Sequence, residues 1–350
     1  MGLKTRESLM RNISRRKTLT ALAFLAAAVG STAAYAQEAT GKLTVYGSTL
    51  EDVVRDVAAA FEAKTGIETV YVRASTGEAL NRIRAEKARP QASVWFGGPG
   101  DSYRVAQDEG LLEAYKSPSA DKIADQFKDP DGYWTGLYTS NLGFASNKGL
   151  LAEKGIDVPT SWDDLLNPEL KGLVAVANPA TSGTAYAYIS TIAQLKGEEA
   201  GFDYLKKASE NIAQYTKSGS APGRMAGSGE IVVGVLMLQD AYLIQQQGFD
   251  LELSSPSEGT GYALEPAAML KDGPDPVEAK MFIDYILSAE GQKVMQEHFH
   301  LLTFTNSDLS ARPEAASLAD LVLIDYDFDW AGANKTRLIE KFQNDVLIAE

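Results

Sequence analysis

The sequence predicts an α/β protein of two lobes joined by a hinge, and two observations carry this prediction. From residue 42 onward, short apolar runs alternate with amphipathic stretches, a pattern typical of parallel strands connected by helices that cover both faces of the sheet. Polar segments that contain glycine also lie beside strands near Thr139 and near Thr260. A chain that leaves one lobe at the first point and returns at the second joins the lobes twice, which makes a hinge with a cleft.

The first part of the chain reads as three strands that alternate with three helices. In the stretch 51–64, Val54, Val57, Ala58 and Phe61 recur at helical spacing and share one face. The expected strands span 42–46, 67–72 and 92–96, and the expected helices span 51–64, 77–89 and 101–109.

The later part continues the alternation, without an internal repeat or a low-complexity linker. In the stretch 184–195, Ala185, Tyr188, Ile189 and Ile192 share one face, as in an amphipathic helix. The expected strands here span 173–177, 230–237 and 262–270, and the expected helices span 184–195 and 276–287. We therefore predict a first lobe of residues 37–139 and 260–350, and a second lobe of residues 140–259.

The first 36 residues have the pattern of a cleavable export signal. Residues 1–17 carry six basic side chains and one acid, residues 19–29 form an apolar run too short to span a bilayer, and Ala34-Tyr35-Ala36 is a small-x-small site. Cleavage is predicted after Ala36. The segment 14–19 (SRRKTL) resembles a twin-arginine signal but lacks the usual aromatic residue, so twin-arginine and Sec export both stay open, with an N-terminal membrane anchor as the further alternative.

Removal of residues 1–36 leaves 27 basic and 46 acidic residues, a net charge of −19. No basic run remains, which argues against nucleic acid or an anionic membrane as a partner. A second apolar run of membrane-spanning length is absent, and so is cysteine, so a hydrophobic core and not disulfides must stabilise the exported chain. We expect a periplasmic monomer that needs no cofactor and does not insert into the membrane.

Five segments of small polar residues lie where a strand ends or a helix begins. Ligands of α/β sheets bind at the carboxyl ends of strands, and helix N-termini there present unpaired N–H groups that favour anions. Serine and threonine add neutral donors, and glycine allows the backbone to approach a ligand closely. The segments are Gly47-Ser48-Thr49, Ala74-Ser75-Thr76-Gly77-Glu78, Gly97-Gly98-Pro99-Gly100, Thr181-Ser182-Gly183-Thr184 and Ser218-Gly219-Ser220-Ala221-Pro222.

Helix capping is the alternative explanation of each segment taken alone. Ser75 with Glu78, and Thr49 with Asp52, match the capping-box spacing, which requires no ligand. A cap does not require the three hydroxyls that residues 181–184 supply. Five such segments, distributed over both predicted lobes, therefore favour a cleft that binds an anion.

Catalytic motifs are few. The two histidines of the chain, His298 and His300, lie near the expected end of a helix, where a surface position explains them better than a metal site. The sequence contains no cysteine nucleophile, no G-x-S-x-G elbow, no Walker loop and no dinucleotide-binding motif. We expect a protein that is not an enzyme, and an exported hydrolase of phosphate esters remains an alternative.

Eight short motifs follow one another along the chain in a specific order. They are Leu43-Thr44-Val45-Tyr46, Phe61-Glu62-Ala63-Lys64-Thr65-Gly66-Ile67, Trp95-Phe96-Gly97-Gly98, Ser161-Trp162-Asp163-Asp164-Leu165, residues 178–186 (NPATSGTAY), residues 218–222, Glu258-Gly259-Thr260-Gly261-Tyr262 and Ser288-Ala289-Glu290-Gly291-Gln292. In this order the motifs resemble the periplasmic solute-binding proteins of ABC importers, in the branch usually labelled ferric-iron-binding. The similarity covers nearly all of the chain after the signal.

The resemblance implies a type II binding-protein fold. Its two lobes would each have a mainly parallel sheet flanked by helices, would be joined by a two-strand hinge, and would close around a solute for delivery to a membrane ABC permease. Ferric-binding members commonly use two adjacent tyrosines, whereas the corresponding place here, residues 238–242 (LQDAY), has one. Members with Trp or Phe before the double glycine, and with the T-S-G-T segment, resemble binders of phosphorylated or phosphonate solutes.

The resulting hypothesis is a periplasmic receptor for a small anionic solute, namely a phosphorylated sugar, an organophosphate or a phosphonate. Gln239 and Asp240 would contact an amine or a sugar hydroxyl on the far side of the solute. Two alternatives remain: a ferric-iron receptor that uses Tyr186, Tyr242 or Asp240, and a receptor whose closed form is read by a chemosensor instead of a permease. The expected ligand-binding residues are Ser48, Thr49, Ser75, Thr76, Gly98, Thr181, Ser182, Gly183, Thr184, Ser218, Ser220, Gln239 and Asp240.

Overall fold

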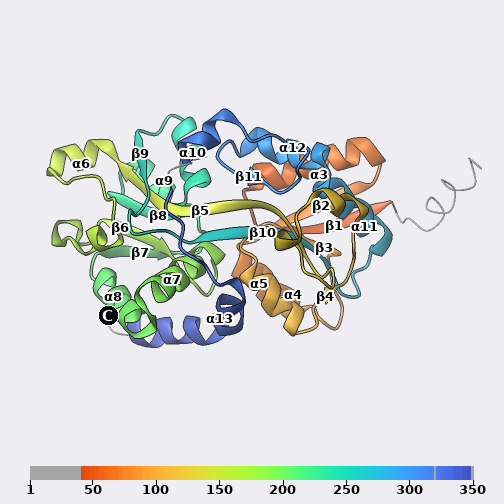
Figure 1. The fold of residues 1–350 in the computed structure, drawn as a ribbon, viewed down its shortest axis with the longest axis horizontal. Coiled ribbons are helices and arrows are strands. Elements are labelled where there is room, and N and C mark those ends of the chain that lie inside the picture. Colours follow the sequence, from red (N-terminus) through yellow and green to blue (C-terminus); the bar gives the residue numbers. More distant parts are fainter. Residues whose placement is uncertain (1–40, 319–320, 348–350) are drawn as a thin grey trace, which may run out of the picture.

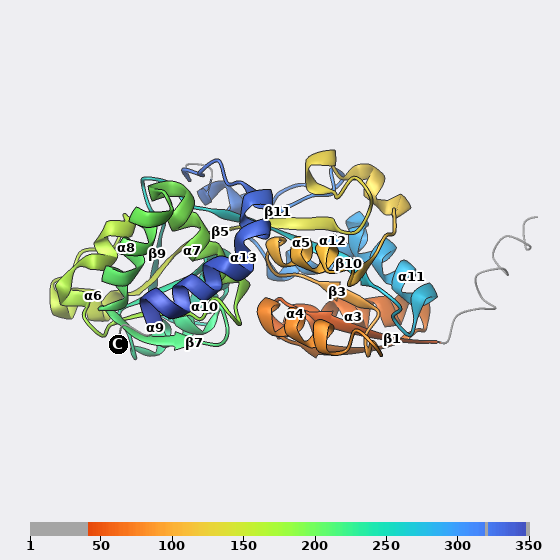
Figure 2. The ribbon, with the colours of Figure 1, turned by 90° about the horizontal axis from the view of Figure 1, so that it is seen from below.

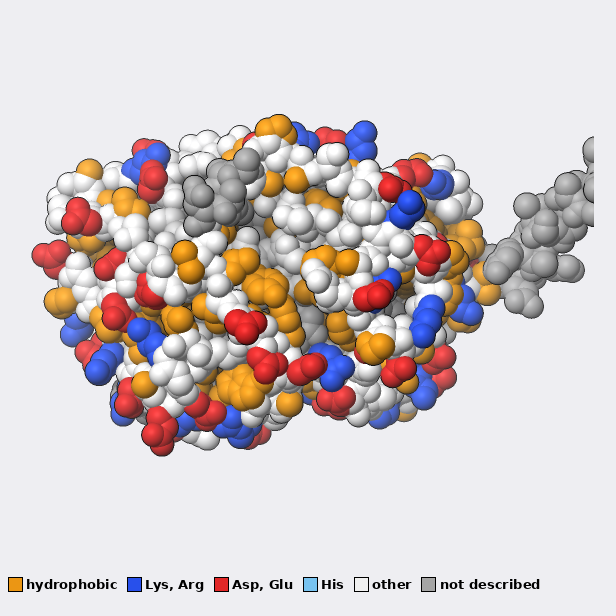
Figure 3. All heavy atoms as spheres, viewed as in Figure 1, with side chains coloured by type: hydrophobic (Ala, Val, Ile, Leu, Met, Phe, Trp, Pro, Cys, Tyr) orange, Lys and Arg blue, Asp and Glu red, His pale blue; other side chains and the backbone are white. Residues whose placement is uncertain are grey.

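The structure is a computed structural model that describes residues 41–318 and 321–347. The predicted export signal and its cleavage site, residues 1–36, lie outside the described residues. Within the described part of the chain, no helix combines the length and the apolar character needed to cross a membrane. Basic and acidic side chains are interspersed over the face shown in Figure 3.

The chain folds into two bodies joined by long strands, as Figure 1 shows. The elements up to the first long strand are β1 (Lys42–Gly47), α3 (Glu51–Thr65), β2 (Glu68–Arg73), α4 (Thr76–Ala85), β3 (Val94–Phe96), α5 (Asp101–Asp108), β4 (Leu112–Glu113), two 3₁₀ helices (Pro118–Lys122 and Asp125–Phe127) and β5 (Thr135–Asn147). The next elements, as far as the second long strand, are α6 (Lys148–Lys154), two 3₁₀ helices (Trp162–Leu166 and Pro168–Leu170), β6 (Val174–Ala177), α7 (Gly183–Lys196), α8 (Glu198–Ser209), β7 (Ile212–Thr216), α9 (Ala221–Ser228), β8 (Val233–Met237), α10 (Leu238–Gln246), β9 (Leu251–Ser254) and β10 (Tyr262–Leu270). The chain continues with α11 (Pro276–Leu287), α12 (Ala289–His298), β11 (Thr303–Phe304), a 3₁₀ helix (Pro313–Leu318), α13 (Phe328–Phe342) and a π-helical turn (Gln343–Leu347).

The strands hydrogen-bond in the order β2-β1-β3-β10-β5-β8-β6-β7. Parallel pairs join β1 to β2 and β3, and join β6 to β7 and β8, as the strand–helix alternation predicts. β5 and β10 are antiparallel to each other and to their other neighbours, so the complete sheet is mixed. The two strands run side by side between the bodies (Figure 1) and form the expected two-strand hinge.

Elements with a regular apolar pattern match their predictions most closely. The predicted strand 262–270 and the predicted helix 276–287 have the bounds of β10 and α11. β5 was not predicted as a strand, because its 13 residues (TGLYTSNLGFASN) interrupt the apolar pattern with glycines and polar side chains. One of these, Ser140, is fully buried, and its hydroxyl donates to the Glu265 carboxylate in the cleft.

We take β1 to β4, α3 to α5, α11 and α12 as the first lobe, and α6 to α10 with β6 to β9 as the second. The boundaries of the lobes stay a proposal. Helix α13, which was expected in the first lobe, contacts both: Leu338 and Phe342 share a hydrophobic cluster with Ile189 of α7, while Gly332 faces Asp101 and Arg104 of α5. Figure 2 shows α13 beside both α5 and α7. We propose that α13 belongs with the second lobe, whose core it completes.

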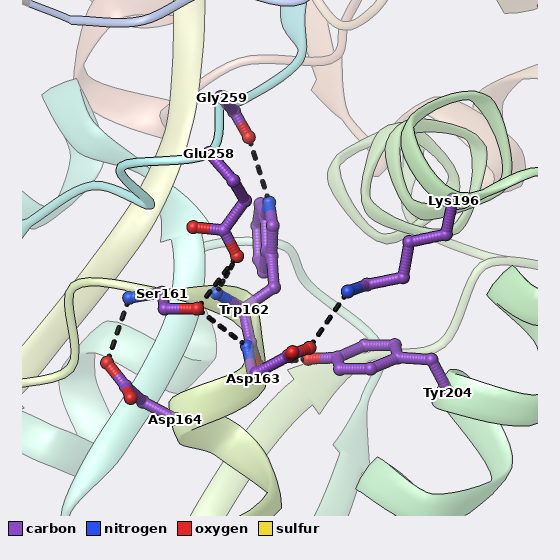
Figure 4. Close-up of polar contacts among 8 residues, drawn as sticks. All are labelled: Ser161, Trp162, Asp163, Asp164, Lys196, Tyr204, Glu258 and Gly259. Carbon is purple, nitrogen blue, oxygen red and sulfur yellow. Dashed lines mark hydrogen bonds and ion pairs between the residues drawn. The ribbon is translucent and has the colours of Figure 1, made fainter.

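Two motifs of the resemblance, Ser161–Leu165 and Glu258–Tyr262, bind each other (Figure 4). Glu258 accepts hydrogen bonds from Ser161 Oγ at 2.9 Å and from the Trp162 backbone N–H at 2.6 Å, and the Trp162 indole donates to the Gly259 carbonyl at 3.0 Å. Tyr204 of α8 donates to the carbonyl of the same tryptophan. These contacts fix the point where the chain leaves the second lobe to form β10, so the motifs position the hinge.

Candidate functional site

A polar cavity lies in the cleft between the two lobes. Its volume is about 40 Å³, enough for a few water molecules, so a larger solute can bind only after the lobes move apart. Residues from both lobes and from β10 line it: Ser48, Thr49, Leu50, Arg73, Ser75, Thr76, Gly98, Pro99, Ser182, Gly183, Thr184, Gly219, Ser220, Met237, Gln239, Asp240 and Glu265.

The lobes touch directly around this cavity. The Gly77 N–H donates to the Thr181 carbonyl at 2.9 Å, and Arg73 Nη2 donates to Ser218 Oγ at 3.4 Å. A Cβ atom placed on Gly183 would lie 2.8 Å from Cδ of Pro99 in the other lobe. These direct contacts between the lobes show that the cleft is closed.

The cavity contains hydroxyl groups whose oxygens already accept a hydrogen bond from the protein. Ser48 Oγ accepts from the Trp95 indole at 2.8 Å, and Thr49 Oγ1 accepts from the Tyr138 hydroxyl at 3.3 Å. Ser182 Oγ accepts from the backbone N–H of the third residue after it at 3.4 Å, as the N-cap of α7. Each hydroxyl still has one proton to donate, so the three hydroxyls can donate to an acceptor in the cavity. A set of free donors of this kind suits an anion.

Arg73, the last residue of β2, is the one basic residue that lines the cavity within the described part of the chain. Its Nε donates to the Thr49 carbonyl at 3.1 Å and its Nη1 to Ser75 Oγ at 3.5 Å, which directs the guanidinium across the cleft. Burial lowers the pKa of Arg73, because the charged form loses water in the closed cleft. A bound anion would compensate that loss.

Two carboxyl groups lie in the same cavity, Asp240 of α10 and Glu265 of the hinge strand. Glu265 accepts from the Gly98 N–H at 2.9 Å and from Ser140 Oγ at 2.7 Å, and burial raises its pKa. Burial, together with the charge of Glu265, raises the pKa of Asp240 to about 7, against the opposing effect of Arg73. Such groups accept hydrogen bonds from hydroxyls or an ammonium, so the cavity can bind a solute with an anionic and a donor end.

Gln239 is buried beside Asp240, and its Oε1 atom has no hydrogen-bond partner among the described residues. A buried acceptor without a partner costs free energy unless a ligand or water satisfies it. This amide therefore adds an acceptor at the carboxylate side of the cavity.

All but two of the predicted ligand-binding residues line this cavity. The exceptions are Thr181, whose hydroxyl donates to the Lys217 carbonyl at 3.0 Å, and Ser218, whose hydroxyl accepts from Arg73. The capping alternative is confirmed for Ser75, whose N–H donates to Glu78 at 3.2 Å, and is wrong for Thr49, because Leu50 is the N-cap of α3. Ser75 and Ser182 thus cap their helices and also line the cavity.

Arg73 and Glu265 were not among the predicted ligand-binding residues. Arg73 follows a predicted strand and precedes a hydroxyl-rich segment, a position that could have marked it. Glu265 is a charged residue within an apolar strand, and the Pro266 that follows it shifts the register between β10 and β5. A charge inside a buried strand signals a functional site or a paired ion, and that signal was present in the sequence.

The tyrosines of the iron alternative do not meet at the cavity. Tyr186 is fully buried, and its hydroxyl donates to the Ala331 carbonyl. The Tyr242 ring lies 5.9 Å from the His300 ring, away from the cavity-lining residues. Among the described residues, no three or more His, Cys, Asp or Glu side chains are grouped so that they could hold a metal ion.

The two histidines also lie away from the cleft. His298 Nε2 is 2.9 Å from an Asp56 carboxylate oxygen on α3, and His300 Nδ1 is 3.6 Å from Glu314. The lining residues therefore offer no imidazole to act as a general base beside the cavity hydroxyls.

Comparisons with known proteins match most of this chain to solute-binding proteins and to an uncharacterized relative. Residues 100–334 match the model of the family described as bacterial extracellular solute-binding protein. An uncharacterized protein of Haemophilus influenzae is 40% identical over 331 residues, which cover 92% of this chain and 96% of that protein.

Two solved structures share both the fold and a substantial part of the sequence. The periplasmic binding protein AfuA from Actinobacillus pleuropneumoniae, solved with exogenous fructose-6-phosphate bound, has a TM-score of 0.84 and 42% identity, over 87% of this chain and 98% of that one. The periplasmic binding protein P5PA has a TM-score of 0.83 and 34% identity, over 87% and 99% of the two chains. These neighbours are two-lobed binding proteins of the type II fold.

Proposed function

Because the chain belongs to the family of bacterial extracellular solute-binding proteins, we propose that its cleft captures a small phosphorylated solute. Proteins of this class bind solutes for membrane ABC permeases, and the family and its structural neighbours are transport proteins, not enzymes. A phosphate or phosphonate group would occupy the side of the cavity that holds the hydroxyls, the helix N-termini and Arg73.

One observation carries the proposal: the cavity hydroxyls of Ser48, Thr49 and Ser182 accept from the protein and keep their protons for a ligand. Together with the N-terminus of α7 and the Arg73 guanidinium, they form a set of donors suited to an oxyanion. The fructose-6-phosphate bound to AfuA is a solute of this chemistry, which supports the same class here.

The two carboxyl groups in the cavity restrict the class of solute further. Asp240 and Glu265 would repel an inorganic anion that filled the whole cavity, but would accept hydrogen bonds from sugar hydroxyls or from an amine. We therefore infer a phosphorylated polyol or an aminophosphonate, with its donor end toward Asp240. Ferric iron is the less suited cargo, because the expected tyrosine ligands do not meet in the cleft.

A thermal-shift panel on residues 37–350 tests the class of solute, with fructose 6-phosphate, methylphosphonate, inorganic phosphate and ferric citrate. A ligand that binds only the folded state, at ~100 times its dissociation constant, adds about 2.7 kcal/mol to stability. We expect a clear rise with fructose 6-phosphate and little change with ferric citrate. A rise with ferric citrate alone would contradict the proposal, and turnover of a chromogenic phosphate ester by the clean protein would indicate a hydrolase instead.

A further inference from the structure

Lys335 of α13 lies buried between the first turns of two helices that begin at the cavity. α5 starts directly after the cavity loop of Gly98 and Pro99, and its first residue is Asp101. α7 starts with two residues of the cavity wall and carries Tyr186 in its first turn. The Lys335 ammonium donates to Asp101 Oδ2 and lies 3.7 Å from the centroid of the Tyr186 ring. One side chain thus connects both helix N-termini behind the solute cavity.

The ion pair is almost completely removed from solvent, since Lys335 is 4% exposed and Asp101 is 3% exposed. A buried pair of this kind stabilises little on balance, but loss of one partner leaves an uncompensated charge and is costly. Burial raises the pKa of Asp101 and lowers that of Lys335, while the attraction between the two groups opposes both shifts. Loss of either partner alone would therefore leave an uncompensated buried charge in the closed cleft.

With α13 assigned to the second lobe, as proposed above, the two charges lie on elements of different lobes. α13 is attached to the second lobe through Leu338 and Phe342, which share the hydrophobic cluster of Ile189, whereas α5 belongs to the first lobe. Figures 1 and 2 show α13 extending from the second lobe to the end of α5. If α13 moves with the second lobe, parting of the lobes to admit a solute separates α5 from α13 and exposes Asp101 to water.

We propose that the Asp101–Lys335 pair is a closure contact that forms as the lobes shut and holds the N-termini of α5 and α7 on the solute. The inference rests on the proposed function, since it assigns these residues a part in solute retention. Lys335 and Asp101 are positioning residues, because neither lines the cavity. They act through the cavity loop before α5 and through Ser182 and Gly183 at the start of α7.

The kinetics of fructose 6-phosphate binding distinguish an effect of a substitution on cleft closure from an effect on the stability of the fold. In Lys335→Met, Asp101 has no partner, and this is costly only in the closed cleft, where Asp101 is buried. We therefore expect the rate of solute dissociation to rise at least tenfold, while the association rate stays within about threefold of the wild-type value. Asp101→Asn is a second single variant, in case the first folds poorly, and is expected to raise the dissociation rate in the same direction. The double variant Asp101→Asn/Lys335→Met leaves no charge unpaired but also lacks the contact, so it is expected to dissociate faster than the wild type and more slowly than either single variant.

Arg337→Met is the matched control. Arg337 lies on the same helix, but its guanidinium pairs with Glu198 of α8 within the second lobe, so its loss is expected to leave the dissociation rate unchanged. If Lys335→Met lowers the melting temperature but dissociates from fructose 6-phosphate like the wild type, the pair only stabilises the fold and the inference is overturned.

Interlobe distances give a test that does not depend on the solute. The chain has no cysteine, so Val70→Cys and Glu210→Cys can carry two spin labels at exposed positions, one on each lobe. Without solute, the labelled wild type is expected to show a closed population that Lys335→Met removes, and a distance distribution unaffected by the substitution would overturn the inference. Failure of fructose 6-phosphate to bind the wild type would instead count against the proposed solute alone.

Discussion

The backbone N–H of Gly77 donates to the carbonyl of Thr181 at 2.9 Å, which joins α4 of the first lobe to the loop before α7 in the second. The two residues belong to different hydroxyl-rich segments that are 104 positions apart in the sequence. Their contact closes the cleft beside the cavity, and it is possible only because residue 77 has no side chain.

The first prediction concerns closure itself. In Gly77→Ala, the new Cβ would lie 2.5 Å from the Ala180 carbonyl oxygen, so the lobes cannot close fully. Overpacking typically costs about 1–3 kcal/mol, and we expect the affinity for fructose 6-phosphate to fall about tenfold or more while the melting temperature without solute changes little. Calorimetric titration measures the affinity. Gly149→Ala in α6, where the new atom meets only ordinary contacts, serves as the control, and equal affinities of the two variants would contradict the prediction.

The second prediction concerns the cavity cation. Arg73→Gln removes the guanidinium that crosses the cleft, and a hydrogen bond to a charged group contributes ~1.5–3 kcal/mol. We expect the affinity for fructose 6-phosphate to fall at least tenfold, with a weaker dependence on salt than in the wild type. The control is Arg55→Gln on the surface of α3, where the guanidinium pairs with Asp52 and Asp56. Equal losses in the two variants would show that net charge, and not a specific contact, governs binding.

The third prediction concerns stability and pH at Asp240. Its carboxyl has a pKa of about 7 in the folded protein, above the unfolded value of about 4. The folded state therefore binds more protons between these two values, so the contribution of this group to stability is complete below pH ~4 and is lost as the pH rises through ~7.

Asp240→Asn removes the loss of stability that accompanies ionisation of Asp240 as the pH rises. The melting temperature of this variant, relative to the wild type, is expected to be higher at pH 8 than at pH 4, when measured without solute. Asp203→Asn, on the exposed side of α8, is the matched control and should show no such trend. A constant difference across the pH range would mean that Asp240 is not the group that titrates.

Most of the predicted ligand-binding residues line one cavity, whereas the hinge strand β5 was not predicted from the apolar pattern. Ser48, Ser75 and Ser182 could be selected because each follows a strand or begins a helix, and the carboxyl ends of strands in this fold face one cleft. Thr181 fits the same pattern, yet its hydroxyl bonds to the backbone, because local turn geometry decides where a threonine points. Small polar residues at strand ends thus indicate which edge of the sheet forms the cleft, but they do not predict where a single side chain points.

Long-range contacts account for what the sequence could not show. Glu265 becomes part of the cavity only because β10 crosses between the lobes, and its partner Ser140 lies on the other crossing strand, β5. Lys335 reaches Asp101 from the far end of the chain, across 234 positions. No local periodicity encodes such pairs, since each depends on how the lobes and α13 pack in three dimensions.

The central claim is that the hydroxyls at the start of α7 bind an anionic group of the solute. Titration calorimetry of fructose 6-phosphate into the wild type and into the double variant Ser182→Ala/Thr184→Ala tests it most directly. At ~1.5–3 kcal/mol for each hydrogen bond to a charged group, the double variant should bind at least tenfold more weakly. An unchanged dissociation constant would mean that residues 181–184 only cap a helix and that the solute binds elsewhere.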